Sequence, residues 1–307
     1  MDFNVIGLGE VLWDLLPTGP QLGGAPANFG YHAHELGAET NVITRVGNDD
    51  YGREIVRRFH ALGLPGNTVQ IDASAPTGTA KVTLSGNGFA HFTIQENVAW
   101  DYLDATLEAL AVAARAHAIC FGSLAQRSQP SRRAIQQLVA TTPADALRVF
   151  DINLRQEFYS RPVIEQSLQL ANVLKLNDDE LLSLATMFRL VSSTEGQMEQ
   201  LAQRFSLRFI ALTRGPKGSL LYQKENDQVR WSDCASSPVK TVDTVGAGDS
   251  FTAALVLGLL LQMDLDEINT LANEVARYVC SQAGATPVVP ADFTRRFSAR
   301  ARQQRPA

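Results

Sequence analysis

Near its C-terminal end the chain contains the sequence Val242-Asp243-Thr244-Val245-Gly246-Ala247-Gly248-Asp249-Ser250-Phe251. This stretch leads into an apolar run, residues 253–261, that predicts a buried helix. A turn with two glycines that enters a helix leaves several backbone N–H groups unpaired, and the positive end of the helix dipole lies behind them. Gly246 and Gly248 carry no side chain that would block an approaching phosphate. The stretch therefore predicts an anion site at the start of a core helix.

Asp249 is the unexpected member of this stretch, because a carboxylate repels the anions that the loop would attract. The conflict disappears if Asp249 takes a proton from a substrate hydroxyl while the loop holds the charge of a transferring phosphoryl group. The alternative is a glycine-rich turn in which Asp249 only interacts with the helix dipole. Taken alone, the stretch is compatible with both interpretations.

Length, charge, apolar runs and cysteine spacing limit the classes of protein to which the chain can belong. The chain has 307 residues, enough for one large α/β unit, and its net charge of −5 argues against a nucleic-acid partner. The longest apolar run, residues 252–263, is too short to cross a bilayer, and residues 1–16 do not have the basic start of a signal peptide. We therefore expect a cytoplasmic protein with no membrane partner. The cysteines are too widely spaced for a zinc site or a disulfide framework: Cys120, Cys234 and Cys280.

Beyond residue 117, apolar strands alternate with amphipathic helices. Strands are expected at residues 118–122, 148–152, 173–176 and 209–213, and helices at residues 131–140, 163–170, 178–187 and 195–205. This alternation indicates an α/β fold with a mostly parallel sheet that is covered by helices on both faces. Ligands of such sheets bind at the carboxyl ends of the strands.

Three polar segments follow these strands. Arg155 could grip a phosphate or be a surface cation. Asn177 and Glu180 have the spacing of a capping box, and a carboxylate there could also hold Mg²⁺ through water. Residues 213–218 could contact a ligand at this edge of the sheet or form only a tight turn between two strands.

The N-terminal part offers candidates for a sugar site. Asp14 stands between Trp13 and Leu15 beside a turn, where it could grip a ligand or face solvent on a strand. Paired glycines at Gly23-Gly24 allow a close approach of the backbone to a ligand. Asn28 lies in the first turns of the next helix, where its amide could meet sugar hydroxyls or cap the helix.

Residues 77–94 do not show the alternation of strands and helices. Two short strands are expected there on either side of a glycine turn at residues 85–88, with no helix between them. Such a hairpin predicts a small sheet over a pocket, and a lid of this kind excludes water from phosphoryl transfer. We expect the lid to be formed by about residues 10–22 and 77–97 of a single domain that spans residues 1–307.

Together these motifs resemble the ribokinase-like (PfkB) carbohydrate kinases along essentially the whole chain. The resemblance implies a three-layer α/β/α sandwich with a mostly parallel central sheet and a small β-sheet lid. The motifs that carry it are Gly23-Gly24 with Asn28, Asn177-x-x-Glu180, Thr213-x-Gly215-x-x-Gly218 and Asp243 to Phe251.

The resemblance also implies roles for individual residues. Asp249 would be the general base, beside an anion hole formed by the N–H groups of Gly246, Ala247 and Gly248. The sugar would contact Asp14, Gly24, Asn28 and Arg155. ATP would contact Asn177, Thr213, Gly215, Gly218 and Asn273. Mg²⁺ would be organised by Glu180 and Asn177, and K⁺ would lie near Asp243 and Val245.

Within the family, the segments at residues 9–14, 121–124 and 151–155 are most similar to fructokinases. We therefore expect an ATP-dependent kinase that phosphorylates a primary hydroxyl of fructose. The alternatives are a 2-keto-3-deoxygluconate kinase, a ribokinase or a nucleoside kinase of the same family, and, outside enzymes, a non-catalytic sugar sensor. The lid could cap its own subunit or pair with that of a second copy in a homodimer.

Overall fold

The computed structural model describes residues 1–17, 19–84, 90–226 and 228–303. Its centre is a nine-stranded sheet with the strand order β13-β12-β11-β10-β9-β8-β1-β4-β5. Neighbouring strands from β11 to β5 run parallel, whereas β12 and β13 add an antiparallel edge. The strands are β1 (Asn4–Leu8), β4 (Glu39–Gly47), β5 (Val69–Asp72), β8 (Ala118–Phe121), β9 (Leu147–Asp151), β10 (Val173–Asn177), β11 (Phe209–Thr213), β12 (Ser219–Glu225) and β13 (Gln228–Cys234).

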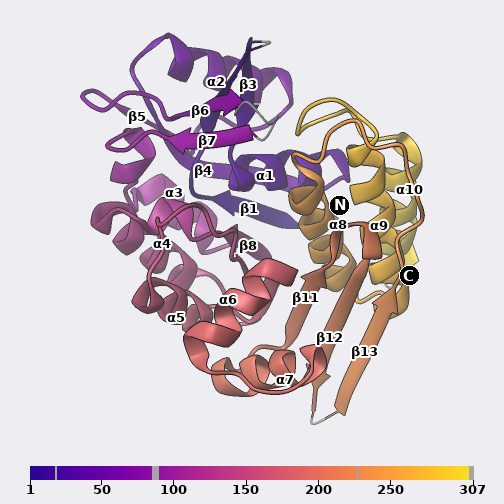
Figure 1. Cartoon of the computed structure of the whole chain (residues 1–307). Coiled ribbons are helices and arrows are strands. Elements are labelled where there is room, and N and C mark those ends of the chain that lie inside the picture. The colour runs from indigo at the N-terminus through magenta and orange to yellow at the C-terminus, as the bar shows by residue number, and fades with distance from the viewer. Residues whose placement is uncertain (18, 85–89, 227, 304–307) are drawn as a thin grey trace.

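Helices cover both faces of this sheet (Figure 1). Alternate residues of a strand point to opposite faces, so Val5 of β1 packs in one core cluster and Ile6 in the other. One face carries α1 (Ala25–Glu35), α8 (Ala247–Leu260), α9 (Leu265–Cys280) and α10 (Ala291–Gln303). The other carries α3 (Leu107–Ala113), α4 (Gln129–Thr141), α5 (Arg161–Leu170), α6 (Asp178–Phe188) and α7 (Thr194–Phe205). The α/β/α sandwich expected from the sequence is confirmed.

Local signals explain where the helices begin. Pro26 lies in the first turn of α1, and the Asp49 side chain accepts the Gly52 N–H at the start of α2 (Asp50–Ala61). The apolar run of residues 253–261 falls in α8, which is buried on most sides, as expected for a helix without a polar face. Among the described helices, none is long and apolar enough to cross a membrane.

A separate four-stranded sheet stands beside the carboxyl edge of β1 and has the order β3-β2-β6-β7. Its strands are β2 (Leu12–Leu16), β3 (Gly19–Gly23), β6 (Thr79–Leu84) and β7 (Ala90–Ile94). The expected hairpin is formed by β6 and β7, and its glycine turn lies outside the described residues. A third core cluster joins this sheet to α2 and β4, since Trp13 packs with Val46 and Phe59. Its function as a lid and the single-domain boundaries stay predictions.

Short 3₁₀ helices follow the strands β7, β8 and β11 in the connecting loops. They are η1 (Ala99–Tyr102), η2 (Leu124–Gln126) and η3 (Gly215–Lys217).

Candidate active site

The N-terminal turns of α1 and α8 meet at the carboxyl edge of the large sheet (Figure 1). Asn28 of α1 donates its Nδ2–H to Asp249 Oδ2 of α8 at 2.8 Å. Gly24 is the N-cap of α1 and has φ of 110°, and a side chain there would collide with the backbone of Glu10. The structure thus brings together Gly24, Asn28 and Asp249, which the sequence had placed in one site from far apart in the chain.

Both glycines of the predicted anion loop lie against neighbouring atoms, and the backbone contact at Gly246 leaves no room for a side chain. Gly246 is the N-cap of α8 with φ of 79°, and a Cβ on it would lie 2.3 Å from the carbonyl oxygen of Ala285. A Cβ on Gly248 would lie 3.0 Å from Lys175 Nζ. The Ala247 N–H donates to Thr244 O in a long bond of 3.3 Å, so this donor would have to exchange partners to hold a phosphate.

The environment of Asp249 changes its acidity. The residue is partly exposed, so a substrate can reach it, yet it is largely surrounded by protein atoms. This burial raises the pKa of Asp249 to about 6, and the nearby Asp151 carboxylate adds to the effect. The hydrogen bond from Asn28 and the charges of Lys175 and Arg155 oppose it. Asp249 is therefore a stronger base than an ordinary aspartate.

A buried ion pair lies beneath Asp249 and was missed in the sequence analysis. Lys175 Nζ of β10 donates to Asp151 Oδ1 of β9 at 3.1 Å, and Thr252 Oγ1 of α8 donates to Asp151 Oδ2 at 2.9 Å. Burial opposes the charge of Lys175, but the surrounding carboxylates, Asp151 first, outweigh it and raise the pKa of this lysine. A lysine inside the apolar strand sequence of residues 173–176 was the signal that could have revealed it.

Glu10 is a second residue that the sequence analysis did not assign to the site. Its side chain is buried, and its Oε2 atom has no hydrogen-bond partner among the described residues. Burial raises the pKa of Glu10 to about 7, although its own N–H and that of Ala25 donate to the carboxylate. The charge of Asp249 raises this pKa further and that of Arg155 lowers it, so Glu10 belongs to the same electrostatic group.

Asp14 and Arg155 come to the same region from β2 and from the loop after β9. Burial raises the pKa of Asp14 to about 6, and the positive charge of Arg155 opposes this rise. Asp14 lies against Gly23, where a Cβ would come 2.4 Å from Asp14 Oδ2. Arg155 itself is exposed and donates to Leu154 O at 3.1 Å. It is the exposed cation that faces Glu10, Asp14 and Asp249.

The pair Asn177 and Glu180 forms a complete capping box at the start of α6. The Glu180 N–H donates to Asn177 Oδ1 at 2.9 Å, and the Asn177 N–H donates to Glu180 Oε2 at 2.8 Å. The second carboxylate oxygen, Glu180 Oε1, accepts the Leu154 N–H at 3.1 Å. Burial raises the pKa of Glu180, while Lys175 opposes this. The capping role is therefore present, and a role toward Mg²⁺ stays a prediction.

The nucleotide candidates lie at the neighbouring strand end. Gly215 and Gly218 have φ of 53° and 92°, and a Cβ on Gly218 would collide with Cys234 O at 1.9 Å. The Thr213 hydroxyl donates to Leu176 O at 3.3 Å. Asn273 of α9 donates to Ser219 Oγ at 2.6 Å, which places it directly behind this turn.

The predicted K⁺ segment is shaped by one carboxylate. Asp243 accepts the Val245 N–H at 3.0 Å and the Gly284 N–H at 3.1 Å, so it ties the loop before α8 to the segment after α9. In the part of the chain that the structure describes, no three His, Cys, Asp or Glu side chains gather in a way that could hold a metal ion by themselves. A cation here would need backbone or water ligands.

Comparison with known proteins adds to this geometry. The sequence model of the "pfkB family carbohydrate kinase" matches residues 19–292. The chain is 31% identical to the fructokinase of Klebsiella pneumoniae over 287 residues, 90% of this chain and 91% of that protein. A sugar kinase of Pyrococcus horikoshii, solved in complex with ATP, shares the fold with a TM-score of 0.76 and 27% identity, over 92% of this chain and 94% of that chain. The fructokinase of Vibrio cholerae O395, solved with fructose, ADP and calcium ion, gives a TM-score of 0.78 and 25% identity, over 95% and 97% of the two chains.

Fold, site and similarity together define a phosphotransferase with an alcohol group as acceptor, of the carbohydrate kinase class. The chain belongs to the pfkB family of carbohydrate kinases. The family resemblance expected from the sequence motifs is thereby confirmed.

Proposed function

We propose that this sugar kinase uses ATP to phosphorylate a primary hydroxyl of fructose, with Asp249 as general base. The observation that carries the proposal is Asp249 itself: a reachable carboxylate in the first turn of α8, held by Asn28 and raised in pKa to about 6. The similarity to fructokinases over nine-tenths of the chain supports the choice of sugar. The neighbour solved with ATP supports the choice of donor.

The chemistry follows from the charge around Asp249. At pH 7 a carboxyl group with a pKa of about 6 is mostly ionised, and it holds a proton more strongly than an ordinary aspartate. It can therefore accept the proton of a sugar hydroxyl as that oxygen attacks the terminal phosphoryl group. The N–H groups of Gly246, Ala247 and Gly248, at the positive end of α8, would stabilise the charge on the phosphoryl oxygens.

The nucleotide and its ions would lie on the β10–β12 side of Asp249. ATP would contact Thr213, Gly215, Gly218, Asn177 and Asn273. A buried carboxylate such as Glu180 fits Mg²⁺ through water, because this ion keeps several waters and needs few protein ligands. When bound, Mg²⁺ would neutralise charge on the phosphate oxygens. K⁺ would be held by backbone carbonyls near Asp243 and Val245.

The sugar side favours a neutral substrate. Asp14 would accept sugar hydroxyls near Gly24, and with Glu10 it makes this part of the site acidic. A sugar that carries a carboxylate would be repelled unless Arg155 neutralises it. Comparing kcat/KM for fructose and 2-keto-3-deoxygluconate in the wild type and in Arg155→Ala separates the two. A wild type that prefers the acidic sugar, and loses that preference with Arg155, would replace fructose by the acidic sugar as substrate.

The decisive measurement is ADP release from ATP and Mg²⁺ with a panel of sugars, nucleosides and sugar acids. We expect turnover with fructose, and a loss of roughly ten- to a hundred-fold in kcat/KM for fructose in Asp14→Ala, since a charge-assisted hydrogen bond contributes about 1.5–3 kcal/mol. The KM for ATP should change little. Sugar binding without any turnover would favour the non-catalytic sensor instead. A cytoplasmic location and a homodimer formed through the small sheet are part of the same proposal.

A further inference from the structure

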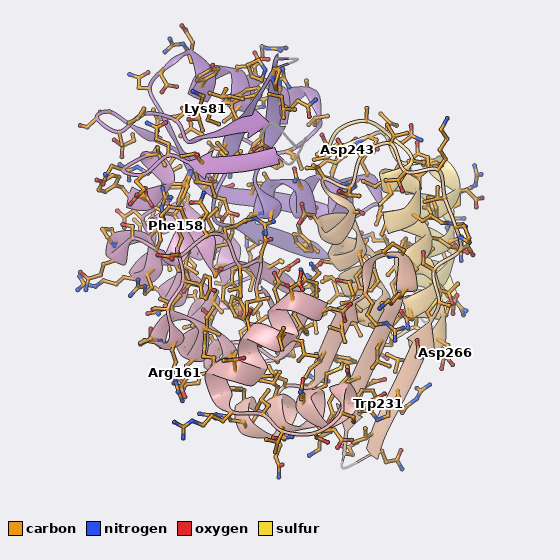
Figure 2. All side chains as sticks on the ribbon, in the orientation of Figure 1. Lys81, Phe158, Arg161, Trp231, Asp243 and Asp266 are labelled. Atoms are coloured by element: carbon orange, nitrogen blue, oxygen red, sulfur yellow. The ribbon has the colours of Figure 1, made fainter. Side chains whose placement is uncertain are left out.

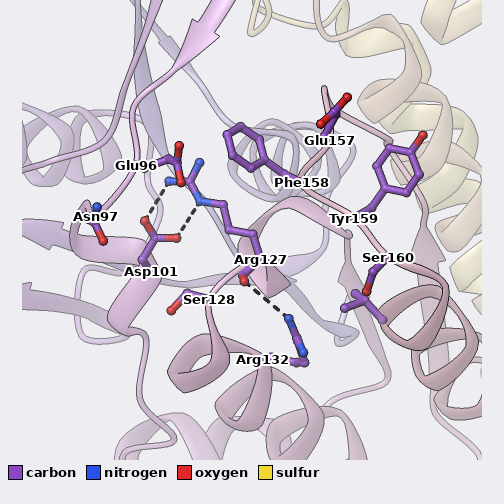
Figure 3. A pocket seen from close by; sticks show the side chains of 11 residues that line it. Glu96, Asn97, Asp101, Arg127, Ser128, Arg132, Glu157, Phe158, Tyr159 and Ser160 are labelled. Atoms are coloured by element: carbon purple, nitrogen blue, oxygen red, sulfur yellow. Dashed lines mark hydrogen bonds and ion pairs between the residues drawn. The ribbon is translucent and has the colours of Figure 1, made fainter.

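A second cavity lies apart from the residues assigned to sugar, nucleotide and metal ions (Figure 3). Its volume is about 400 Å³, within the usual range for small-molecule sites of about 300–1,000 Å³. Three segments enclose it: the chain that leaves β7, the turn between η2 and α4, and the loop between β9 and α5. Within the described part of the chain, none of the site residues assigned above lines this cavity.

Two helices begin at this cavity. Ser128 is the N-cap of α4 and Ser160 is the N-cap of α5, and both serines line the cavity. Neither serine side chain caps its helix, although serine is a preferred residue at this position. The helices have 13 and 10 residues, and each presents the positive end of its dipole. Proline at the second position, Pro130 and Pro162, removes one N–H donor from each first turn, so the free donors there are those of the neighbouring residues.

Arg127 supplies an independent sign of a missing partner. Its side chain is only 7% exposed, and two of its nitrogens donate to Asp101 at 2.8 Å. The guanidinium lies between the rings of Trp100 and Phe158, at 4.0 and 4.6 Å from their centres. Its Nη1 is buried and has no hydrogen-bond partner among the described residues. An unpaired buried donor costs about 1–3 kcal/mol, so this wall of the cavity holds one unsatisfied donor that is enclosed by protein atoms.

Arg132 adds a cation with no acidic partner. Its Nε donates to Gln126 O at 2.8 Å, and none of the ion pairs between described residues includes it. Figure 3 shows Arg132 between Ser128 and Ser160, on the side of the cavity where the two helices start. The acidic groups that face the cavity without a cation are Glu96 and Glu157. Both are exposed at its rim, where water and salt screen their charges.

We propose that this cavity is a binding site for a phosphorylated small molecule that acts as an effector. The phosphoryl group would bind Arg132, the hydroxyls of Ser128 and Ser160 and the N-terminal N–H groups of α4 and α5. Several donors from different directions suit a tetrahedral phosphate better than a planar carboxylate.

The walls of the cavity connect it to the sugar site. Arg127 donates to Gln95 O at 2.6 Å, directly after β7 of the small sheet. Phe158, which packs against Arg127, donates its N–H to Arg155 O at 3.1 Å, in the loop that presents Arg155. A ligand in the cavity that both residues line would stiffen the base of the small sheet and the Arg155 loop together, so it should change the KM for the sugar.

The first test is binding at a blocked active site. With a non-hydrolysable ATP analogue, Mg²⁺ and fructose present, inorganic phosphate and, separately, a hexose monophosphate are titrated by calorimetry. We expect one further saturable equivalent in the wild type. Its affinity should fall at least tenfold in Arg132→Gln and stay unchanged in Arg133→Gln, because Arg133 is exposed on the same helix and does not line the cavity. Tighter binding of the hexose monophosphate would assign the ligand as an organic phosphate, and equal binding as free phosphate.

The variant Arg132→Lys controls for a loss of binding that is caused by misfolding, because it keeps the positive charge but loses the Nε contact with Gln126. Binding that survives in Arg132→Lys and is lost in Arg132→Gln supports a phosphate contact. No saturable binding in the wild type, or equal binding in Arg132→Gln, overturns the site. In kinetics, the ligand should shift the sugar KM at least twofold in the wild type and Arg133→Gln only. A ligand that binds through Arg132 without changing this KM overturns the effector role.

Discussion

Two ion pairs of nearly equal burial, Arg127–Asp101 and Lys175–Asp151, behave differently. Arg127 and Asp101 form a closed pair, in which both carboxylate oxygens accept a guanidinium nitrogen at 2.8 Å. Lys175 and Asp151 are joined by one bond of 3.1 Å, and the second oxygen of Asp151 is held only by a threonine hydroxyl. In the first pair one positive charge faces one negative charge. In the second, the positive charge of Lys175 also interacts with further carboxylates.

The acidity of the carboxyl groups reflects this difference. Around Lys175, burial raises the pKa values of Asp249 and Glu180, and the charge of Asp151 adds to this rise. The charge of Lys175 opposes the rise in both groups without cancelling it. Excess acid in a desolvated site produces a base that binds a proton near neutral pH. A balanced pair such as Arg127 and Asp101 instead joins two segments of the chain. Surplus negative charge therefore distinguishes the carboxyl groups around Lys175 from the pair formed by Arg127 and Asp101.

Removing the base should have the largest effect. In Asp249→Asn we expect kcat to fall by roughly 10²–10⁴, the usual range for a general base, with sugar and ATP binding retained. Steady-state kinetics and calorimetry on the same preparation measure both quantities. Turnover close to that of the wild type would exclude Asp249 as the base, and a parallel loss of binding would indicate a structural role.

Replacing Lys175 or Arg127 by methionine tests this difference between the two ion pairs directly. Both Lys175→Met and Arg127→Met leave a carboxylate buried without its partner, which costs about 3–5 kcal/mol. Urea unfolding should therefore show similar losses in the two variants. Only Lys175→Met should also strongly lower kcat, because Asp151 and Asp249 would then share a proton. Equal kcat in the two variants would contradict the assignment of Lys175 to the catalytic cluster.

Glu10 should make stability depend on pH. Its pKa of 4.5 in the unfolded chain is raised to about 7 in the folded one, so the folded state binds this proton more tightly. The contribution of Glu10 to stability is then present below about pH 4.5 and is lost as the pH rises to about 7. The difference in unfolding free energy between Glu10→Gln and the wild type should grow by up to about 3 kcal/mol over this interval.

The pH dependence of stability that remains in Glu10→Gln should include contributions from Asp14, Asp249 and Glu180, whose pKa values are also raised. Glu39→Gln, at an exposed position, is the control and should leave the pH dependence as in the wild type. A constant offset between Glu10→Gln and the wild type from pH 4.5 to 7 would argue against a buried, protonated Glu10.

The smallest effect concerns the capping box. Glu180→Gln keeps the shape of the side chain and removes its charge, so it should raise the Mg²⁺ concentration required for half-maximal rate more than it raises the sugar KM. Loss of a helix cap by itself would cost about 0.5–2 kcal/mol. A lower melting temperature with unchanged Mg²⁺ dependence would leave Glu180 with the capping role alone.

Much of the fold was determined by local features of the sequence. Apolar strands that alternate with helices specify a parallel sheet covered on both faces, because each element must bury one face. The stretch from Asp243 to Phe251 predicts an anion loop and a general base from its glycines and one carboxylate, and both stay predictions. The hairpin with no helix between its strands predicted the small separate sheet.

Only the tertiary structure decided the electrostatics of the site. Thr252 reaches Asp151 across 101 residues of sequence, and Asn28 reaches Asp249 across 221. Glu10 in its sequence looks like an ordinary strand-end carboxylate, yet folding buries it and leaves one oxygen without a partner among the described residues. Acidity depends on burial and on charges within a few ångströms, and these neighbours come from strands and helices far apart in the chain. Sequence pattern could therefore specify which residues form the sheet and the loop, while folding determined which carboxylates compete for the single buried lysine of the site.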